Sequence, residues 1–250
     1  MDESSKISSA DVRASTMGLL AGFVVAAALA GCGLSSSPFE KAKKIKCLCH
    51  MGNIDQAMQS YALQRGHYPP AHIDDDRGRP MHSWRVLLLP YLDQKAIYDR
   101  YRFDEPWDGP NNRKLHDIVI PLYCCPAVGE STNTSYVVVT GPHTAFPGKG
   151  EVTPKYINDH DGSGVTGLIV EAVDAGIHWM EPRDLPIDKL ANAAAGDKQH
   201  GITTRHPGGS TVGLADGKRA FLRNDAPDAM LKALFTIDGG EQIDWARLFE

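Results

Sequence analysis

The sequence predicts an α+β fold that opens with one long helix and continues into short β-strands. Three observations support this prediction. Apolar side chains recur at three- and four-residue steps over residues 39–63, as they do on one face of a helix. Short runs rich in β-branched residues follow after residue 115. Further on, Asp216-Gly217 separates two apolar runs, which is a strong local signal for a β-hairpin.

The composition is that of one globular domain with many loops. Of the 250 residues, 42% are hydrophobic and 23% are charged, so the chain is long and apolar enough to bury a core. The 24 glycines and 16 prolines favour a strand-containing protein over a helical bundle. The formal net charge is -5 and the chain has no basic block, so nucleic acid is not expected as a partner.

The first 31 residues resemble a signal peptide. Lys6 and Arg13 precede an apolar run over residues 17–30. A run of about 14 residues is short for a membrane-spanning helix, which needs about 20, and is typical of a signal-peptide core. The run ends in Leu29-Ala30-Gly31-Cys32, which resembles the lipobox of bacterial lipoproteins. An uncleaved membrane anchor and a cytoplasmic chain are the alternatives.

These features predict an exported, membrane-anchored protein. Residues 1–31 would be removed, the Cys32 thiol would receive a diacylglyceryl group, and residues 32–39 would form a short tether. Two or three acyl chains anchor a protein stably where a single chain does not. The remaining residues, 40–250, would form a single domain in the periplasm or at the cell surface.

The domain is expected to begin with the helix over residues 39–63. Gly66 ends this helix, and Pro69-Pro70 prevents its continuation. Residues 83–94 and 96–101 predict one or two short helices with aromatic and aliphatic anchors, followed by a loop rich in proline, glycine and asparagine.

Strands dominate the second half of the domain. The β-branched runs at residues 135–140 and 166–171 are predicted strands. Residues 210–215 and 218–222 flank the Asp-Gly turn and form the predicted hairpin. Two short amphipathic helices are expected near the C-terminus, at residues 227–235 and 241–249.

Several blocks of the sequence, in the same order, resemble one family. The blocks are residues 47–61, 68–70, 83–94, 104–110 and 179–185. A histidine followed after nine residues by Asp-Gly, here His206 and Asp216-Gly217, resembles the signature of the planctomycete prepilin-like proteins of unknown function, DUF1559. The resemblance implies a pilin-like arrangement, in which the long N-terminal helix packs on an antiparallel β-sheet.

The chain departs from that family at its N-terminus. Family members usually begin with a prepilin leader, Gly-Phe-Thr-Leu-Ile-Glu, before a long apolar stalk. This sequence has neither the leader nor an apolar stalk after Cys32. The resemblance therefore covers the globular part, about residues 40–242, and does not extend to filament assembly.

Four cysteines remain once Cys32 is assigned to the lipid. They are Cys47, Cys49, Cys124 and Cys125. Four thiols allow three pairings, and the sequence alone does not choose between them. The resemblance implies one cysteine at position 47 and one at position 125, which favours a Cys47–Cys125 disulfide, with Cys49–Cys124 as an additional bond.

Two alternatives to these disulfides stay open. The first is a zinc site that combines Cys47, Cys49 and His50 with Cys124 and Cys125. The cysteine pairs in that set lack the usual two-residue spacer that lets both thiolates reach one ion. The second alternative is free thiols.

The sequence gives little support to an enzyme. It contains no Gly-x-Ser-x-Gly nucleophile motif, no P-loop and no dinucleotide-binding glycine fingerprint. His200, His206 and Asp216 have the chemistry for a metal site or an acid–base pair. We favour structural roles, in which Asp216 accepts N–H bonds in its own turn and His206 bridges to a neighbouring strand. Catalytic residues, metal ions and cofactors are therefore not expected.

As a whole, the sequence favours a non-enzymatic cell-envelope lipoprotein with a structural or interaction role. Its expected partners are the membrane, through the lipid anchor, and envelope proteins such as secretion or pseudopilus machinery. One alternative is an envelope binding module for calcium or glycan built on the loops around Asp159, Asp161 and Trp179, although the other ligands of an EF-hand are missing. The other alternative is a metal-assisted hydrolase that uses His206 and Asp216.

Overall fold

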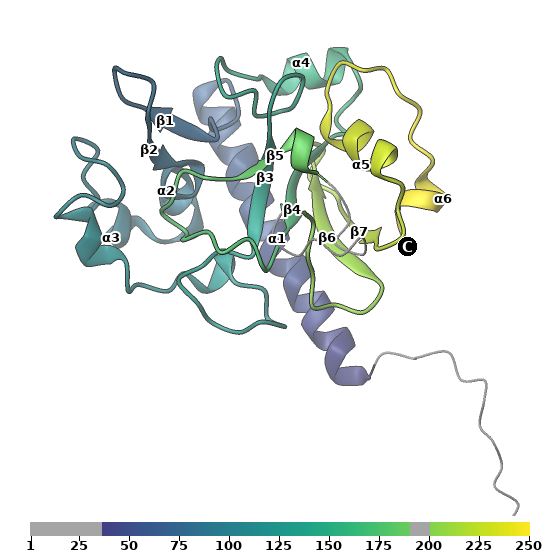
Figure 1. Cartoon of the computed structure of the whole chain (residues 1–250), viewed down its shortest axis with the longest axis horizontal. Coiled ribbons are helices and arrows are strands. Elements are labelled where there is room, and N and C mark those ends of the chain that lie inside the picture. The colour runs from purple at the N-terminus through teal and green to yellow at the C-terminus, as the bar shows by residue number, and fades with distance from the viewer. Residues whose placement is uncertain (1–36, 191–200) are drawn as a thin grey trace, which may run out of the picture. The chain divides into compact units, whose positions relative to one another are not determined.

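A long helix packed against a five-stranded sheet forms the centre of the molecule (Figure 1). The computed structural model describes residues 37–190 and 201–250. The expected signal peptide and the Cys32 lipidation site lie outside these described residues. The α+β prediction is confirmed, with one difference. The strand order is β5-β3-β4-β6-β7, and the edge strand β5 pairs parallel with β3, whereas the other pairs are antiparallel.

The long helix α1 spans Pro38–Arg65, close to the predicted 39–63. It starts where the Ser37 side chain accepts a hydrogen bond from the Glu40 N–H, and Pro38 occupies the first turn, where a missing N–H does no harm. It ends at Gly66, whose φ of 86° is a left-handed conformation that glycine adopts without strain. Its apolar face, from Cys47 to Ala62, is buried.

The strands of the sheet are short and largely buried. They are β3 (Tyr136–Thr140), β4 (Gly167–Glu171), β5 (Leu185–Pro186), β6 (Gly209–Leu214) and β7 (Arg219–Arg223). Successive side chains of a strand point to opposite faces. Tyr136 and Val138 therefore pack with α1, whereas Val137 and Val139 join a second apolar cluster with α5 (Asp228–Phe235) and α6 (Trp245–Leu248). Helices thus cover both faces, which explains why all of β4 and β6 is buried.

Smaller elements surround this centre. They are β1 (His72–Asp74), β2 (Pro80–Ser83), α2 (Trp84–Leu88), η1 (Leu89–Leu92), α3 (Lys95–Tyr98), η2 (Asn112–Leu115), η3 (Pro121–Tyr123), α4 (Pro154–Asp159) and η4 (Ile187–Lys189). The short helices expected at 83–94 and 96–101 are present as α2, η1 and α3. The β1–β2 hairpin and α4 were not predicted, and the helix expected at 241–249 is shorter.

The predicted hairpin is confirmed as β6 and β7, which pair antiparallel from Gly209↔Arg223 to Gly213↔Arg219. Its turn also rests on α1. Ala215 O accepts hydrogen bonds from Gln59 Nε2 at 3.0 Å and from the Tyr68 hydroxyl at 3.2 Å. The C-terminal end of α1's buried face is therefore held by the turn that follows β6.

A buried ion pair joins α2 to the edge of the sheet. Arg85 Nη2 lies 2.6 Å from Asp184 Oδ1, and both side chains are at most 2% exposed. Arg85 also donates to Tyr136 O, and the Asp184 carboxylate accepts from Val138 N–H. The pair therefore sets where β5 meets β3.

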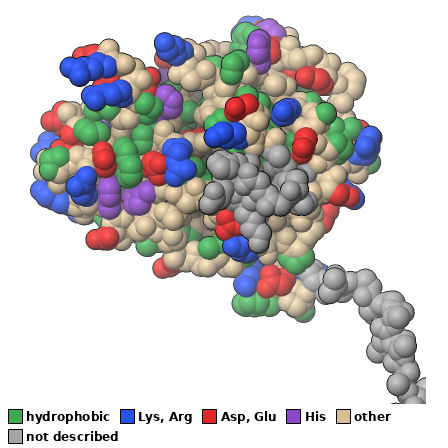
Figure 2. All heavy atoms as spheres, viewed as in Figure 1, with side chains coloured by type: hydrophobic (Ala, Val, Ile, Leu, Met, Phe, Trp, Pro, Cys, Tyr) green, Lys and Arg blue, Asp and Glu red, His purple; other side chains and the backbone are tan. Residues whose placement is uncertain are grey.

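Neither sign of charge dominates the one face that Figure 2 shows. On the face drawn in Figure 2, basic and acidic side chains are interspersed among apolar ones. Within residues 37–190 and 201–250, no helix is both long enough and apolar enough to span a bilayer.

Candidate functional site

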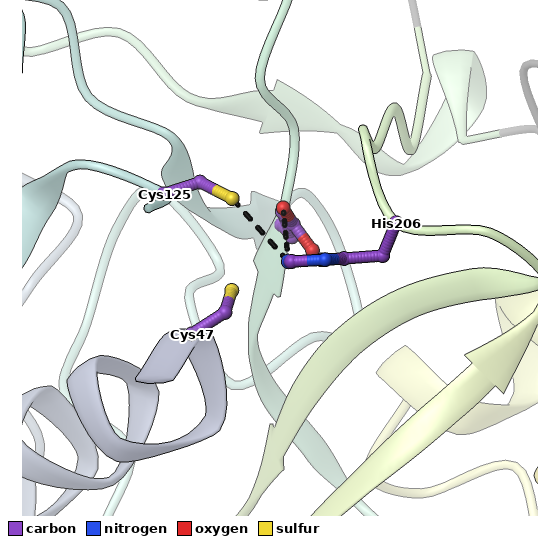
Figure 3. A group of neighbouring side chains, drawn as sticks. Cys47, Cys125 and His206 are labelled. Atoms are coloured by element: carbon purple, nitrogen blue, oxygen red, sulfur yellow. Dashed lines mark hydrogen bonds and ion pairs between the residues drawn. The ribbon is translucent and has the colours of Figure 1, made fainter. Parts of the chain in front are cut away.

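Four side chains that can bind metals meet under the N-terminal half of α1. Cys47 comes from α1, Cys125 from the loop after η3, Glu171 from the end of β4, and His206 from the loop before β6. We call these four residues the core cluster. Each residue offers one sulfur, nitrogen or oxygen atom that could bind a metal, and these four atoms all lie within 4.8 Å of one another. All four residues are buried, and none is more than 3% exposed. Figure 3 shows Cys47, Cys125 and His206 pointing toward one another.

The His206 ring approaches two of the other members. Its Nε2 is 3.4 Å from Cys125 Sγ and 3.6 Å from Glu171 Oε1. His206 belongs to the loop that precedes β6, and its own N–H donates to the Thr204 hydroxyl at 3.0 Å. The loop is thus folded back so that the imidazole enters the space between α1 and the sheet.

A shell of hydrogen bonds orients the Glu171 carboxylate. Its Oε2 accepts from Thr211 N–H at 3.2 Å, from the Thr211 hydroxyl at 3.4 Å and from the Thr204 hydroxyl at 3.2 Å. Its Oε1 is buried and has no hydrogen-bond partner within the described part of the chain. One oxygen is therefore fixed by the protein, while the other points at His206.

The two thiols are also held in place. Cys47 Sγ lies 3.1 Å from the Tyr136 hydroxyl and 3.4 Å from that of Thr211. Cys125 Sγ accepts from the N–H of Ala127 at 3.4 Å. Tyr136 belongs to β3 and Thr211 to β6, so the Cys47 thiol touches two strands of the sheet.

The electrostatics of the core cluster favour bound protons. Burial raises the pKa of Glu171 to about 8. The hydrogen bond to Cys47, followed by burial, raises the pKa of Cys125 to about 12. Burial lowers the pKa of His206, but its bond to Cys125 and the charge of Glu171 outweigh burial, and the net shift is upward. At neutral pH the Cys125 thiol and the Glu171 carboxyl group therefore hold their protons.

The predicted disulfides are not formed. Cys47, Cys49, Cys124 and Cys125 are all free thiols. Cys49 is exposed because successive helix residues are rotated by about 100°, so a residue two positions after the buried Cys47 faces solvent. Cys124 points the other way and donates to Ser131 O at 3.1 Å. Cys47 and Cys125 do approach each other, but their sulfur atoms contact Tyr136 and His206 instead of bonding.

The zinc site considered from the sequence, with Cys47, Cys49, His50, Cys124 and Cys125 as ligands, is not assembled in the fold. Only Cys47 and Cys125 of that set enter the core cluster. His50 Nδ1 instead contacts Cys124 O at 3.0 Å.

His206 and Asp216 lie at opposite ends of β6 and do not form one site, because the intervening strand is extended. Asp216 caps its own turn, where Oδ1 accepts from Lys218 N–H at 2.9 Å. The carboxylate beside His206 is Glu171, which the sequence reasoning missed. The available signal was its place at the end of an apolar strand, on the same face as Ile169. His200 lies outside the described residues.

The loops considered for calcium or glycan are otherwise engaged. Asp161 accepts the N–H groups of Gly239 and Gly240, and Asp159 forms an ion pair with Lys155. Trp179 is 1% exposed and donates from Nε1 to a backbone carbonyl, so its ring offers no surface to a sugar.

Comparison with known proteins places the chain in a family. A family model described as a protein of unknown function, DUF1559, matches residues 37–167, more than half of the chain. The matched stretch contains α1 and Cys125, whereas Glu171 and His206 follow it. No curated protein and no solved structure was found to match. The chain therefore belongs to the DUF1559 family of proteins of unknown function.

Proposed function

We propose that this protein is a non-enzymatic envelope lipoprotein whose pilin-like domain has a structural or interaction role. One observation supports this most directly. The first turns of α1 extend beyond the sheet (Figure 1) and combine apolar with basic side chains. Phe39 and Ile45 are 67% and 62% exposed, and Lys41 and Lys46 are exposed beside them. Such a surface suits the boundary between acyl chains and anionic headgroups.

The membrane would be the first partner of this protein. Only a short segment separates the expected Cys32 lipid anchor from the exposed turns of α1, so both would approach the same bilayer. The domain would then present its opposite end to envelope proteins, with secretion or pseudopilus machinery as the candidate partner. The burial of the core cluster supports a non-enzymatic role, because a substrate would need an open path to reactive groups.

Mass spectrometry of the protein isolated from native membranes tests the anchor. We expect a mature N-terminus at Cys32 that carries diacylglycerol, and we expect Cys32→Ser to move the protein into the soluble fraction. Cys49→Ser is the matched control, since Cys49 is the exposed thiol of the domain, and it should stay with the membrane. An unmodified full-length N-terminus would rule out the anchor.

A binding module is the second candidate, and one observation favours it. A groove of about 620 Å³ lies between α1, η1 and α3. It is lined by Tyr61, Gln64, Arg65, Ile73, Leu87, Pro90, Tyr91, Lys95, Tyr98 and Phe103. Several aromatic rings beside polar side chains are a surface on which sugars can stack.

Calorimetry with envelope oligosaccharides tests whether this groove binds sugars. Tyr98→Ala should abolish any binding, and Tyr156→Ala, at an exposed tyrosine elsewhere, should not.

A further inference from the structure

The core cluster has the composition of a zinc site. It offers two thiols, one imidazole and one carboxylate, which are the ligand types that Zn²⁺ binds in proteins. Metal–ligand bonds of 2.0–2.3 Å at tetrahedral angles place two ligand atoms about 3.3–3.8 Å apart. The two distances that His206 Nε2 makes, 3.4 Å to sulfur and 3.6 Å to oxygen, already fall within this range.

Two buried atoms of the core cluster, Glu171 Oε1 and His206 Nδ1, have no hydrogen-bond partner among the described residues, and a bound ion would account for the first. Glu171 Oε1 is buried without a hydrogen-bond partner among the described residues, although buried polar atoms are nearly always paired. Its only ion-pair partner in the described part of the chain is His206. Three donors fix the Oε2 oxygen of Glu171, and its Oε1 oxygen faces the other ligand atoms of the cluster. Outer-shell hydrogen bonds orient metal-binding carboxylates in this way.

We propose that the core cluster binds one Zn²⁺ ion and that this ion joins α1 to the sheet. The imidazole would bind through Nε2, the atom that faces the cluster, and the carboxylate through Oε1. On binding, the two thiols, the protonated carboxyl group and His206 Nε2, where it carries a proton, would release their protons to solvent, so the site would hold the ion as two thiolates, one carboxylate and one neutral imidazole. This zinc-site proposal does not depend on the envelope role proposed above.

The proposed site is structural. Four protein ligands fill a tetrahedral ion and leave no position for water or substrate. The ligands come from four separate segments, namely α1, the loop after η3, the end of β4 and the loop before β6. The ion would therefore connect the N-terminal helix to both halves of the sheet, and it would explain why His206 is turned inward ahead of β6.

Metal content and cobalt substitution of the full-length chain test the proposal. The protein is purified with a non-chelating reductant, stripped with a chelator and titrated with Zn²⁺ or Co²⁺. We expect one ion per chain, and with cobalt the intense visible bands of tetrahedral geometry together with thiolate charge-transfer absorption. Zinc should also raise the Tm of the stripped protein. Acidification should weaken binding, because protons compete for the same groups.

The other thiols of the chain provide matched controls. Cys47→Ser and Cys125→Ser should each weaken zinc binding by at least about 100-fold and remove thiolate absorption, whereas Cys49→Ser and Cys124→Ser should keep both. Because a ligand variant can fail to fold, Thr211→Val provides a milder change that leaves all four ligands present. It should weaken binding by about 10–100-fold, because the Thr211 hydroxyl donates to Glu171 and also contacts the Cys47 thiol.

Three results would overturn the proposal. The first is that the stripped protein takes up no zinc. The second is that the Cys49 and Cys124 variants lose the ion as readily as the Cys47 and Cys125 variants do. The third is a Cys47–Cys125 disulfide in protein isolated without reductant from its native compartment, since oxidised sulfur would not provide the two thiolates.

Discussion

Asp55 is a carboxylate buried on α1 beside the hairpin turn. It is 2% exposed, and its Oδ1 has no hydrogen-bond partner among the described residues. Burial raises its pKa from 3.8 to about 7. The folded protein therefore holds a proton on Asp55 that the unfolded chain releases above pH 4. Stability should accordingly fall as the pH rises from about 4 to about 7, by roughly 4 kcal/mol in full.

Replacing Asp55 with asparagine should remove this pH dependence. Between pH 5 and pH 8 the wild-type protein should lose about 3 kcal/mol more stability than Asp55→Asn. Urea unfolding at the two pH values measures the difference. Asp104→Asn, at an exposed carboxylate, should leave the pH dependence as in the wild type. If the two asparagine variants behave alike, Asp55 is ionised in the folded protein at low pH and the expected slope is wrong.

Three of the four residues of the core cluster could be identified from the sequence, but their meeting point could not. Cys47 and Cys125 could be identified through the family resemblance, and His206 through its signature. Their proximity to Glu171 could not, because the four residues are far apart in the chain and meet only when α1 lies on the sheet. The disulfide prediction had the right pair of cysteines but the wrong chemistry, since the thiols contact Tyr136 and His206.

The connection of α2 to the sheet depends on the buried pair of Arg85 and Asp184. Asp184→Ala should destabilise the protein by about 3–5 kcal/mol, because it leaves a buried guanidinium without its counter-charge. Replacing both residues by apolar ones, in Arg85→Met with Asp184→Leu, should lose less. Asp99→Ala removes the exposed pair with Lys95 and should change stability by less than about 1 kcal/mol. Chemical denaturation measures all three, and equal effects of the two alanine variants would contradict the argument.

The pairing of β6 with β7 depends on a glycine. A Cβ added at Gly209 would lie 2.0 Å from Leu222 O, an atom of the neighbouring backbone. Gly209→Ala should therefore force the two strands apart and destabilise the protein by about 1–3 kcal/mol or more in thermal or urea unfolding. At Gly164 the nearest atom would be 3.5 Å away, so Gly164→Ala should stay within about 0.5 kcal/mol of the wild type. A folded Gly209→Ala protein of unchanged stability would show that β6 can shift.

At the scale of elements, local patterns were sufficient for α1 and for the hairpin. The 3.6-residue period and the Gly66 stop define α1, and the Asp-Gly turn defines β6 and β7. The β1–β2 hairpin could not be foreseen, because its strands are only three and four residues long. The parallel pairing of β5 was equally hidden, since it depends on the distant contact between Asp184 and Val138.

The molecule as a whole needs the region beyond the family match. The match ends at residue 167, yet β6 lies between β4 and β7 and is the strand of the sheet that contacts α1 most extensively. A chain that ends at residue 203 should therefore fail to fold, with lost circular dichroism and no cooperative unfolding. A chain that ends at residue 240 loses only α6 and the last residues, and should fold with reduced stability because Leu248 and Phe249 are buried. Cooperative unfolding of the shorter chain would show that residues 37–203 are an independent unit.

The packing of α1 on β6 has a consequence for how the chain can change in length. Cys47 and Met51, four residues apart, face Thr211 and Gly213, two residues apart, and Asp55 then reaches the turn. Four helical residues advance about 6 Å and two strand residues about 6.6 Å. Every fourth residue of α1 therefore meets every second residue of β6. A single inserted residue in β6 would rotate its side chains to the opposite face and break this match along its whole length. Insertions and deletions among relatives should accordingly spare these two segments and collect in the connections around them.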